Sequence, residues 1–230
     1  MADRRPPRDG VVLFDLDGTF ADTAPDMAAA LDKLLRRHGR APLPFARVRP
    51  FASHGAPGLL RVGFGLTPED PDYEPLRGEY LRIYESALVE HTAPFPGMIE
   101  LIDTLEARGL PWGIVTNKST ALAEPLLERI GFLERAACLV CGDTTPRPKP
   151  HPDPLLYACD LLGVDPERGW YVGDAERDIQ AGLAAGMGTL AALFGYLGPD
   201  DDPGAWGAHG MIDHPLQLLD WLAYDAASDA

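Results

Sequence analysis

Short apolar runs alternate with amphipathic helical stretches along most of this chain, and this alternation limits its fold more than any other feature. Repeated strand and helix patterns of this kind predict a parallel sheet covered by helices on both faces, which is an α/β, Rossmann-like architecture. The first run, residues 11–14, is apolar at every position, as expected for a central strand buried on both sides. The other expected strands are residues 112–115, 139–141, 170–172 and 189–193.

The segment between the first two expected strands is too long for a simple connection. About 90 residues separate them, whereas a strand–helix–strand crossover needs only about 30. Apolar residues recur at helical spacing within residues 27–35, 59–64 and 76–88, and Thr23 and Asp26 have the spacing of a capping box before the first of these helices. We therefore expect a helical cap domain at residues 21–92, inserted into a catalytic core of residues 1–20 and 93–230.

Near its C-terminal end the chain is expected to lose regular structure. Residues 195–210 are rich in glycine and proline, which favours an extended surface loop. A last helix is expected at residues 216–222.

The charge and hydropathy of the chain limit its partners. A formal net charge of -15 means that most of the surface would repel nucleic acid or an anionic membrane. No stretch approaches the roughly 20 apolar residues that a membrane helix needs, and no signal-peptide pattern is visible. We therefore expect a cytoplasmic protein that binds neither nucleic acid nor a membrane, and its oligomeric state stays open.

Polar residues follow three of the expected strands. Ligands of an open parallel sheet bind beyond the carboxyl ends of its strands, so these residues are expected to meet at one edge. Carboxylates gathered there repel one another and lose hydration, which calls for a cation; Mg²⁺ prefers oxygen ligands and leaves positions for a phosphate. Lys149, in a loop between two prolines, would add a positive charge. The strand-end residues are Asp15, Asp17, Gly18, Thr19, Thr116, Asn117, Gly173 and Asp174, with Asp178 one helical turn further on.

Four short motifs in this order resemble the haloacid dehalogenase superfamily of phosphohydrolases. One such motif alone is unspecific, whereas four together at strand ends are specific. The resemblance extends from about Val11 to the last helix and implies a type-one helical cap between the first and second motifs. The motifs are Asp15-Leu16-Asp17-Gly18-Thr19, Thr116-Asn117-Lys118, Lys149-Pro150, and Gly173-Asp174 followed by Asp178.

The resemblance implies a two-step reaction. Asp15 would be the nucleophile, accepting the phosphoryl group before passing it to water. Asp17 would protonate the leaving oxygen and later activate the water. Thr116, Asn117 and Lys149 would hold the phosphoryl oxygens where charge develops during transfer.

The resemblance also implies a magnesium site and a tight turn beside it. Asp15, the backbone carbonyl of Asp17, and Asp174 would ligate Mg²⁺, with Asp178 as a direct ligand or as an anchor behind the ligands. Gly18 would allow the chain to turn tightly around the bound phosphate.

Asp17 indicates the reaction class in part. A dehalogenase releases a halide, which needs no acid to protonate it, whereas hydrolysis of a phosphomonoester releases an alkoxide, which does. The chain therefore looks like a phosphatase acting on a small phosphomonoester. A sugar phosphomutase of the same superfamily is the alternative, since the motifs do not separate the two. A non-catalytic phosphate-binding module is a further alternative, although no motif residue is missing.

The resemblance narrows to the phosphoglycolate phosphatase group through residues 14–19, 22–26 and 116–118. Short segments within 68–77 and 195–215 are similar to N-acetylmuramic acid 6-phosphate phosphatases. Both groups imply a small phosphorylated acid as substrate, either N-acetylmuramic acid 6-phosphate or 2-phosphoglycolate. Specificity is expected to come from the cap, where the candidates to bind the acid or a hydroxyl are Arg47, Arg49, His54 and Arg61.

Overall fold

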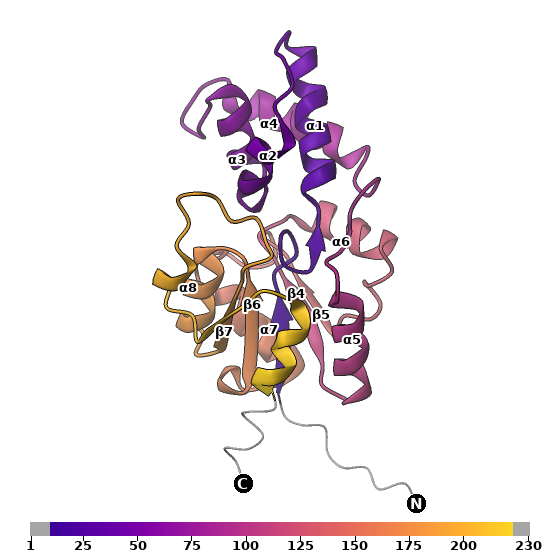
Figure 1. The fold of residues 1–230 in the computed structure, drawn as a ribbon, viewed down its shortest axis with the longest axis vertical. Coiled ribbons are helices and arrows are strands. Elements are labelled where there is room, and N and C mark those ends of the chain that lie inside the picture. The colour runs from indigo at the N-terminus through magenta and orange to yellow at the C-terminus, as the bar shows by residue number, and fades with distance from the viewer. Residues whose placement is uncertain (1–9, 223–230) are drawn as a thin grey trace, which may run out of the picture.

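The computed structural model describes residues 10–222, which contain a six-stranded parallel sheet (Figure 1). Its strands are β1 (Val11–Phe14), β4 (Trp112–Val115), β5 (Cys138–Val140), β6 (Gly169–Gly173), β7 (Gly188–Ala192) and β8 (Gly210–Ile212). They lie in the order β5-β4-β1-β6-β7-β8, so β1 is an interior strand. The predicted α/β fold is confirmed.

Four helices cover the two faces of this sheet: α5 (Met98–Ala107), α6 (Thr120–Arg129), α7 (Asp153–Leu162) and α8 (Glu176–Ala184). Side chains of β1 alternate between the faces, as in any strand. Val12 and Phe14 share a hydrophobic cluster with α5 and α6, whereas Val11 and Leu13 share another with α7 and α8. Among the described residues, no helix has the length and apolar character needed to cross a membrane.

The pairing of β1 brings several strand ends to one edge of the sheet. Phe14 lies opposite Ile114 of β4 and Val172 of β6, and all three strands run parallel. The backbone N–H of Asp15 donates to the carbonyl of Val172 at 2.9 Å. The residues that follow these strands therefore meet beyond the same carboxyl edge.

Five of the six strands lie within two residues of the apolar runs that predict them, and β8 is the exception. β8 is three residues long, begins with a glycine, and exposes 51% of Met211, so it carries no apolar run. The stretch expected to be only a loop thus ends in an edge strand. The last helix begins with a 3-10 turn, Pro215–Gln217, and continues through residue 222.

Between β1 and β4 the chain forms a helical insertion beyond the carboxyl edge of the sheet, at the top of Figure 1. An antiparallel pair, β2 (Ala21–Asp22) and β3 (Ala93–Pro94), carries the chain into and out of it. The Tyr80 hydroxyl donates to the carbonyl of Met27, joining two of its helices. The elements of the insertion are α1 (Ala24–Arg37), α2 (Phe45–Val48), the 3-10 helix η1 (Arg49–His54), α3 (Gly55–Phe64) and α4 (Tyr73–Glu85).

The expected capping box at the start of α1 is wrong. Thr23 makes no side-chain cap, and its hydroxyl donates instead to Asp17 Oδ1 at 2.6 Å. Asp26 is buried and accepts hydrogen bonds from the backbone N–H groups of residues 90–92 at 2.8–3.1 Å and from the Thr92 hydroxyl at 2.7 Å. One carboxylate therefore joins the first helix of the insertion to the segment that returns to the core.

Replacing this carboxylate is expected to destabilise the protein. In Asp26→Asn an NH₂ group faces backbone donors, so buried N–H groups lose their acceptor, and the free energy of unfolding is expected to fall by about 2–4 kcal/mol. Urea unfolding followed by circular dichroism measures the change. Asp32→Asn on the same helix is the control, because Asp32 is partly exposed. Equal stabilities of the two variants would contradict the structural role of Asp26.

Candidate active site

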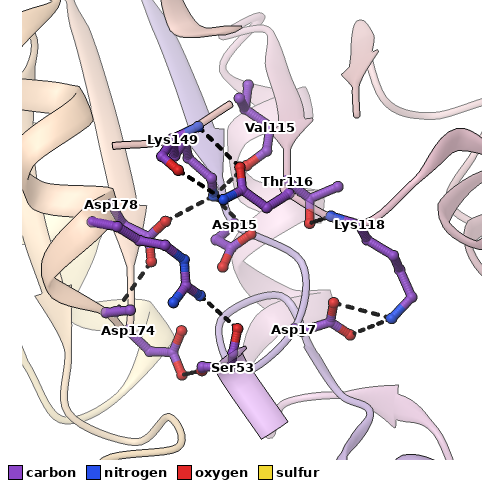
Figure 2. Close-up of polar contacts among 12 residues, drawn as sticks. Asp15, Asp17, Ser53, Val115, Thr116, Lys118, Lys149, Asp174 and Asp178 are labelled. Atoms are coloured by element: carbon purple, nitrogen blue, oxygen red, sulfur yellow. Dashed lines mark hydrogen bonds and ion pairs between the residues drawn. The ribbon is translucent and has the colours of Figure 1, made fainter. Parts of the chain in front are cut away.

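Asp15 lies in a buried cluster of charges at the end of β1 (Figure 2). Lys149 Nζ is 2.9 Å from Asp15 Oδ1 and 2.7 Å from Asp178 Oδ1, and the Lys149 side chain is fully buried. The same ammonium donates to the Val115 carbonyl at 2.9 Å. Contact with two carboxylates and a carbonyl offsets the cost of burying the ammonium group.

Asp174 follows β6 and faces this cluster. Its Oδ2 accepts hydrogen bonds from the Ser53 hydroxyl at 2.6 Å and from the backbone N–H of Tyr196 at 2.8 Å. Its Oδ1 is buried and has no hydrogen-bond partner among residues 10–222. Burial, together with the nearby charges of Asp15 and Asp178, raises the pKa of Asp174 to about 7. The carboxylate is therefore held where its charge is poorly compensated.

The buried carboxylates fit a divalent cation. Oxygen atoms of Asp15, Asp174 and Asp178 lie within 4.8 Å of one another. Lys149 supplies a single positive charge to this group, and the unpartnered Oδ1 of Asp174 is an available ligand. An all-oxygen donor set of this kind suits Mg²⁺. The carboxylate of Asp17 is not part of this group; the residue is expected to contribute its backbone carbonyl to the metal site.

The Asp17 side chain is instead turned toward a second lysine (Figure 2). Lys118 Nζ lies 2.8 Å from Asp17 Oδ1 and 3.0 Å from Oδ2, and both side chains are largely buried. The Thr23 hydroxyl donates to the same Oδ1. The ammonium of Lys118 also lies 4.9 Å from the centroid of the Tyr84 ring, which belongs to the insertion. Asp17 is thus held by groups from both the core and the start of the insertion.

Thr116 and Asn117 follow β4 and adjoin the cluster. The Asn117 side chain pairs with the backbone of Lys149: its Nδ2 donates to the carbonyl at 2.9 Å, and its Oδ1 accepts from the N–H at 3.0 Å. Thr116 Oγ1 accepts from the backbone N–H of Lys118 at 3.2 Å. The Asn117 side chain therefore fixes the loop that carries Lys149.

Gly18 sits at the tightest point of the loop after β1. Its φ is +86°, and a Cβ there would clash with the Asp174 carboxylate and lie 2.9 Å from the Tyr196 ring. Both the backbone angle and the lack of space require glycine. The expected tight turn at Gly18 is present, and contact of this turn with a bound phosphate stays a prediction.

A cavity of about 590 Å³ opens between the acidic cluster and the insertion. Asp15, Asp17, Thr116 and Asn117 reach its core side, and helix α4 lines the side of the insertion. Its volume is in the range of sites for small molecules. Other residues that line the cavity include Ser53, His54, Arg77, Tyr80, Leu81, Tyr84, Lys118, Asp143 and Arg177.

The candidate substrate-binding residues of the insertion are placed differently from one another. His54 lines the cavity, whereas Arg47, Arg49 and Arg61 do not. Arg49 Nη1 donates to the Gly195 carbonyl at 2.8 Å, and its guanidinium lies 4.8 Å from the centroid of the Tyr196 ring. Arg49 therefore docks the insertion on the core, and its contact with substrate stays a prediction.

Several residues at the cavity are not singled out by the sequence. Lys118 belongs to the motif Thr116-Asn117-Lys118, but the sequence indicates no role for it. Arg177 stands between two of the motif aspartates and donates to the Ser53 carbonyl at 2.7 Å. Ser53 carries no local signal. Arg77 lies in the segment 68–77, where the sequence shows a family resemblance but indicates no role for this residue. The packing of the insertion brings both residues to the site.

The chain is similar in sequence to known proteins over nearly its whole length. Residues 12–192 match the model of the haloacid dehalogenase-like hydrolase family. The chain is 45% identical to N-acetylmuramic acid 6-phosphate phosphatase of Pseudomonas aeruginosa, over 92% of this chain and 93% of that protein. It is 43% identical to phosphoglycolate phosphatase of Xanthomonas campestris, over 93% of this chain and 96% of that protein. The structure of a haloacid dehalogenase-like hydrolase from Streptococcus pneumoniae superposes on this chain with a TM-score of 0.78 at 22% identity. The superposition covers 92% of this chain and 97% of that protein.

A parallel Rossmann-like sheet with an acidic cluster and a buried lysine at its carboxyl edge is the arrangement of a hydrolase that acts on phosphoryl groups. The chain belongs to the haloacid dehalogenase-like hydrolase family. Its enzyme class is phosphomonoester hydrolase, the class of its named relatives.

Proposed function

We propose that this phosphomonoester hydrolase is Mg²⁺-dependent and works through an aspartyl phosphate on Asp15. The observation that carries the proposal is the position of Asp15, which belongs both to the buried carboxylate cluster and to the cavity wall. A nucleophile has to meet the substrate and the cation at once, and Asp15 is the cluster member that reaches both.

In the first step a carboxylate oxygen of Asp15 attacks phosphorus. The new O–P bond forms as the ester O–P bond breaks, and Asp17 gives a proton to the leaving oxygen. In the second step Asp17 takes a proton from water, whose oxygen displaces Asp15 and releases phosphate. Because both oxygens of Asp17 contact Lys118 Nζ, this ion pair has to loosen for Asp17 to reach the leaving group.

The phosphoryl oxygens would be held by groups that the fold has already fixed. Lys149 offers its ammonium, Thr116 its hydroxyl, and Asn117 its backbone N–H, since the Asn117 side chain is engaged with Lys149. Gly18 would leave space for the chain to pass close to the phosphate. The Thr116 hydroxyl and the Asn117 N–H would not have to reorganise during the reaction, whereas Lys149 would have to exchange one of its contacts with Asp15, Asp178 or the Val115 carbonyl for a phosphoryl oxygen.

The cation would be held by Asp15, Asp174 and the backbone carbonyl of Asp17, with Asp178 as ligand or anchor. Asp178 Oδ2 accepts from the backbone N–H of Ala175 at 3.1 Å, and its Oδ1 contacts Lys149, which favours the anchoring role. Bound Mg²⁺ would supply positive charge for the transferring phosphoryl group and offset the repulsion among the carboxylates.

The substrate is proposed to be a small phosphorylated acid, N-acetylmuramic acid 6-phosphate or 2-phosphoglycolate, as the names of the two relatives suggest. Residues 21–92 would act as a cap domain over a core of residues 1–20 and 93–230. The position of the cavity between the insertion and the acidic cluster supports this division.

Removal of the cation tests the proposal. With EDTA, release of phosphate from p-nitrophenyl phosphate and from the acid that the enzyme cleaves is expected to fall by about 10²-fold or more, and excess Mg²⁺ is expected to restore it. A colorimetric phosphate assay measures the rates. Activity that persists at full rate in EDTA would refute the magnesium dependence, and transfer of phosphate to a second sugar without its release would identify a mutase.

A further inference from the structure

One face of helix α4 forms a wall of the cavity over the acidic cluster. Arg77, Tyr80, Leu81 and Tyr84 all line the cavity. Their spacing of three, four and seven residues from Arg77 places them on one side of the helix. The wall is aromatic and apolar along most of its length and cationic at one end.

Tyr84 marks the end of this wall nearest to the reacting groups. Its ring contacts the Lys118 ammonium, which in turn contacts Asp17. Arg77 lies two helical turns before Tyr84, so its backbone is roughly 10 Å farther along the helix. Helical side chains lean toward the N-terminal end, and the contact of Arg77 with Glu74, one turn earlier, agrees with that direction. Arg77 is therefore distant from the site of phosphoryl transfer.

Arg77 is also available to a ligand. Its ion pair with Glu74 is long, at 3.4 Å, and the Glu74 side chain is 72% exposed, so the pair contributes little. The other cations that line the cavity are engaged: Lys118 with Asp17, and Arg177 with the Ser53 carbonyl. An arginine on a partly apolar wall is suited to bidentate recognition of a carboxylate.

We propose that Arg77 binds the carboxylate of the substrate and selects phosphorylated acids in which a sugar ring separates the carboxylate from the phosphate. This inference rests on the proposed function. In 2-phosphoglycolate a single methylene separates the two groups, so a molecule with its phosphate at Asp15 cannot span the wall. In N-acetylmuramic acid 6-phosphate the pyranose ring lies between them, and Tyr80 and Leu81 would pack against its apolar faces.

A matched pair of substrates tests this inference. N-acetylglucosamine 6-phosphate is the same phosphorylated amino sugar without the lactyl acid. Arg77→Met is expected to lower kcat/KM for N-acetylmuramic acid 6-phosphate by about 10- to 100-fold, mainly through KM, because a charged hydrogen-bonded pair is lost. The variant is expected to act on N-acetylglucosamine 6-phosphate and p-nitrophenyl phosphate within about twofold of the wild type, and Arg77→Lys is expected to recover part of the loss.

Arg82→Met is the matched control, since Arg82 is exposed on the same helix and does not line the cavity. Thermal unfolding checks that each variant folds. Equal losses on both sugar phosphates, or no loss on the acid, would overturn the role of Arg77 while leaving the proposed function intact. A wild-type enzyme that cleaves p-nitrophenyl phosphate but neither acid would overturn the proposed substrate and the role of Arg77 with it.

Discussion

Asp15→Asn is expected to lower the rate of phosphate release by about 10⁴-fold or more, because the amide cannot attack phosphorus. The fold is expected to survive, since Lys149 keeps its contacts with Asp178 and the Val115 carbonyl. Steady-state phosphate release and thermal unfolding measure the two effects. Acid quench during turnover of a ³²P-labelled substrate is expected to trap label on the wild-type protein and none on the variant.

Asp143→Asn is the matched control for this experiment. Asp143 also lines the cavity, but its carboxylate accepts hydrogen bonds from Thr120 and lies outside the cluster around Lys149. This control is expected to keep most of the activity. Phosphate release by Asp15→Asn at a rate near that of the control would exclude a covalent intermediate on Asp15.

Lys149→Met is expected to damage both activity and stability. Without the ammonium, the buried carboxylates of Asp15 and Asp178 lose the cation that contacts them directly, so the free energy of unfolding without metal is expected to fall by about 3–5 kcal/mol. The value of kcat is expected to fall by about 10²-fold or more, because the proposed donor to the phosphoryl group is lost. Added Mg²⁺ is expected to recover part of the stability by neutralising the same carboxylates.

Denaturant unfolding with and without Mg²⁺, beside phosphate release, measures these effects. Lys33→Met is the control, because Lys33 is exposed on α1 and is expected to change stability by less than about 0.5 kcal/mol. A Lys149→Met protein as stable and as active as this control would show that Lys149 is not the counter-ion of the cluster.

The sequence predicts the sheet well wherever burial leaves a run of apolar residues. β1 is apolar throughout, so its central position can be inferred, and Asp15 follows it directly. β8 leaves no such run, because an edge strand of three residues needs little burial. The capping box fails for a different reason: the donors to Asp26 begin 64 residues away, and a local spacing rule cannot detect a partner at that distance.

The core of the site follows from the sequence more fully than its outer wall. Asp15, Asp174 and Asp178 meet because parallel strands align their carboxyl ends, which is a property of the fold class. The wall depends on how the insertion packs on the core. The sequence favours Arg49 as a substrate-binding candidate and assigns no role to Arg77, yet Arg49 contacts backbone carbonyls and Arg77 lines the cavity.

The hydrogen bond from Ser53 to Asp174 joins residues 121 positions apart across the boundary between the insertion and the sheet (Figure 2). Any rotation that lifts η1 off the sheet breaks this bond and removes one of the two donors to Asp174 Oδ2. Admission of a molecule to the cavity by such a rotation therefore changes the electrostatic environment of the carboxylate cluster in the same movement.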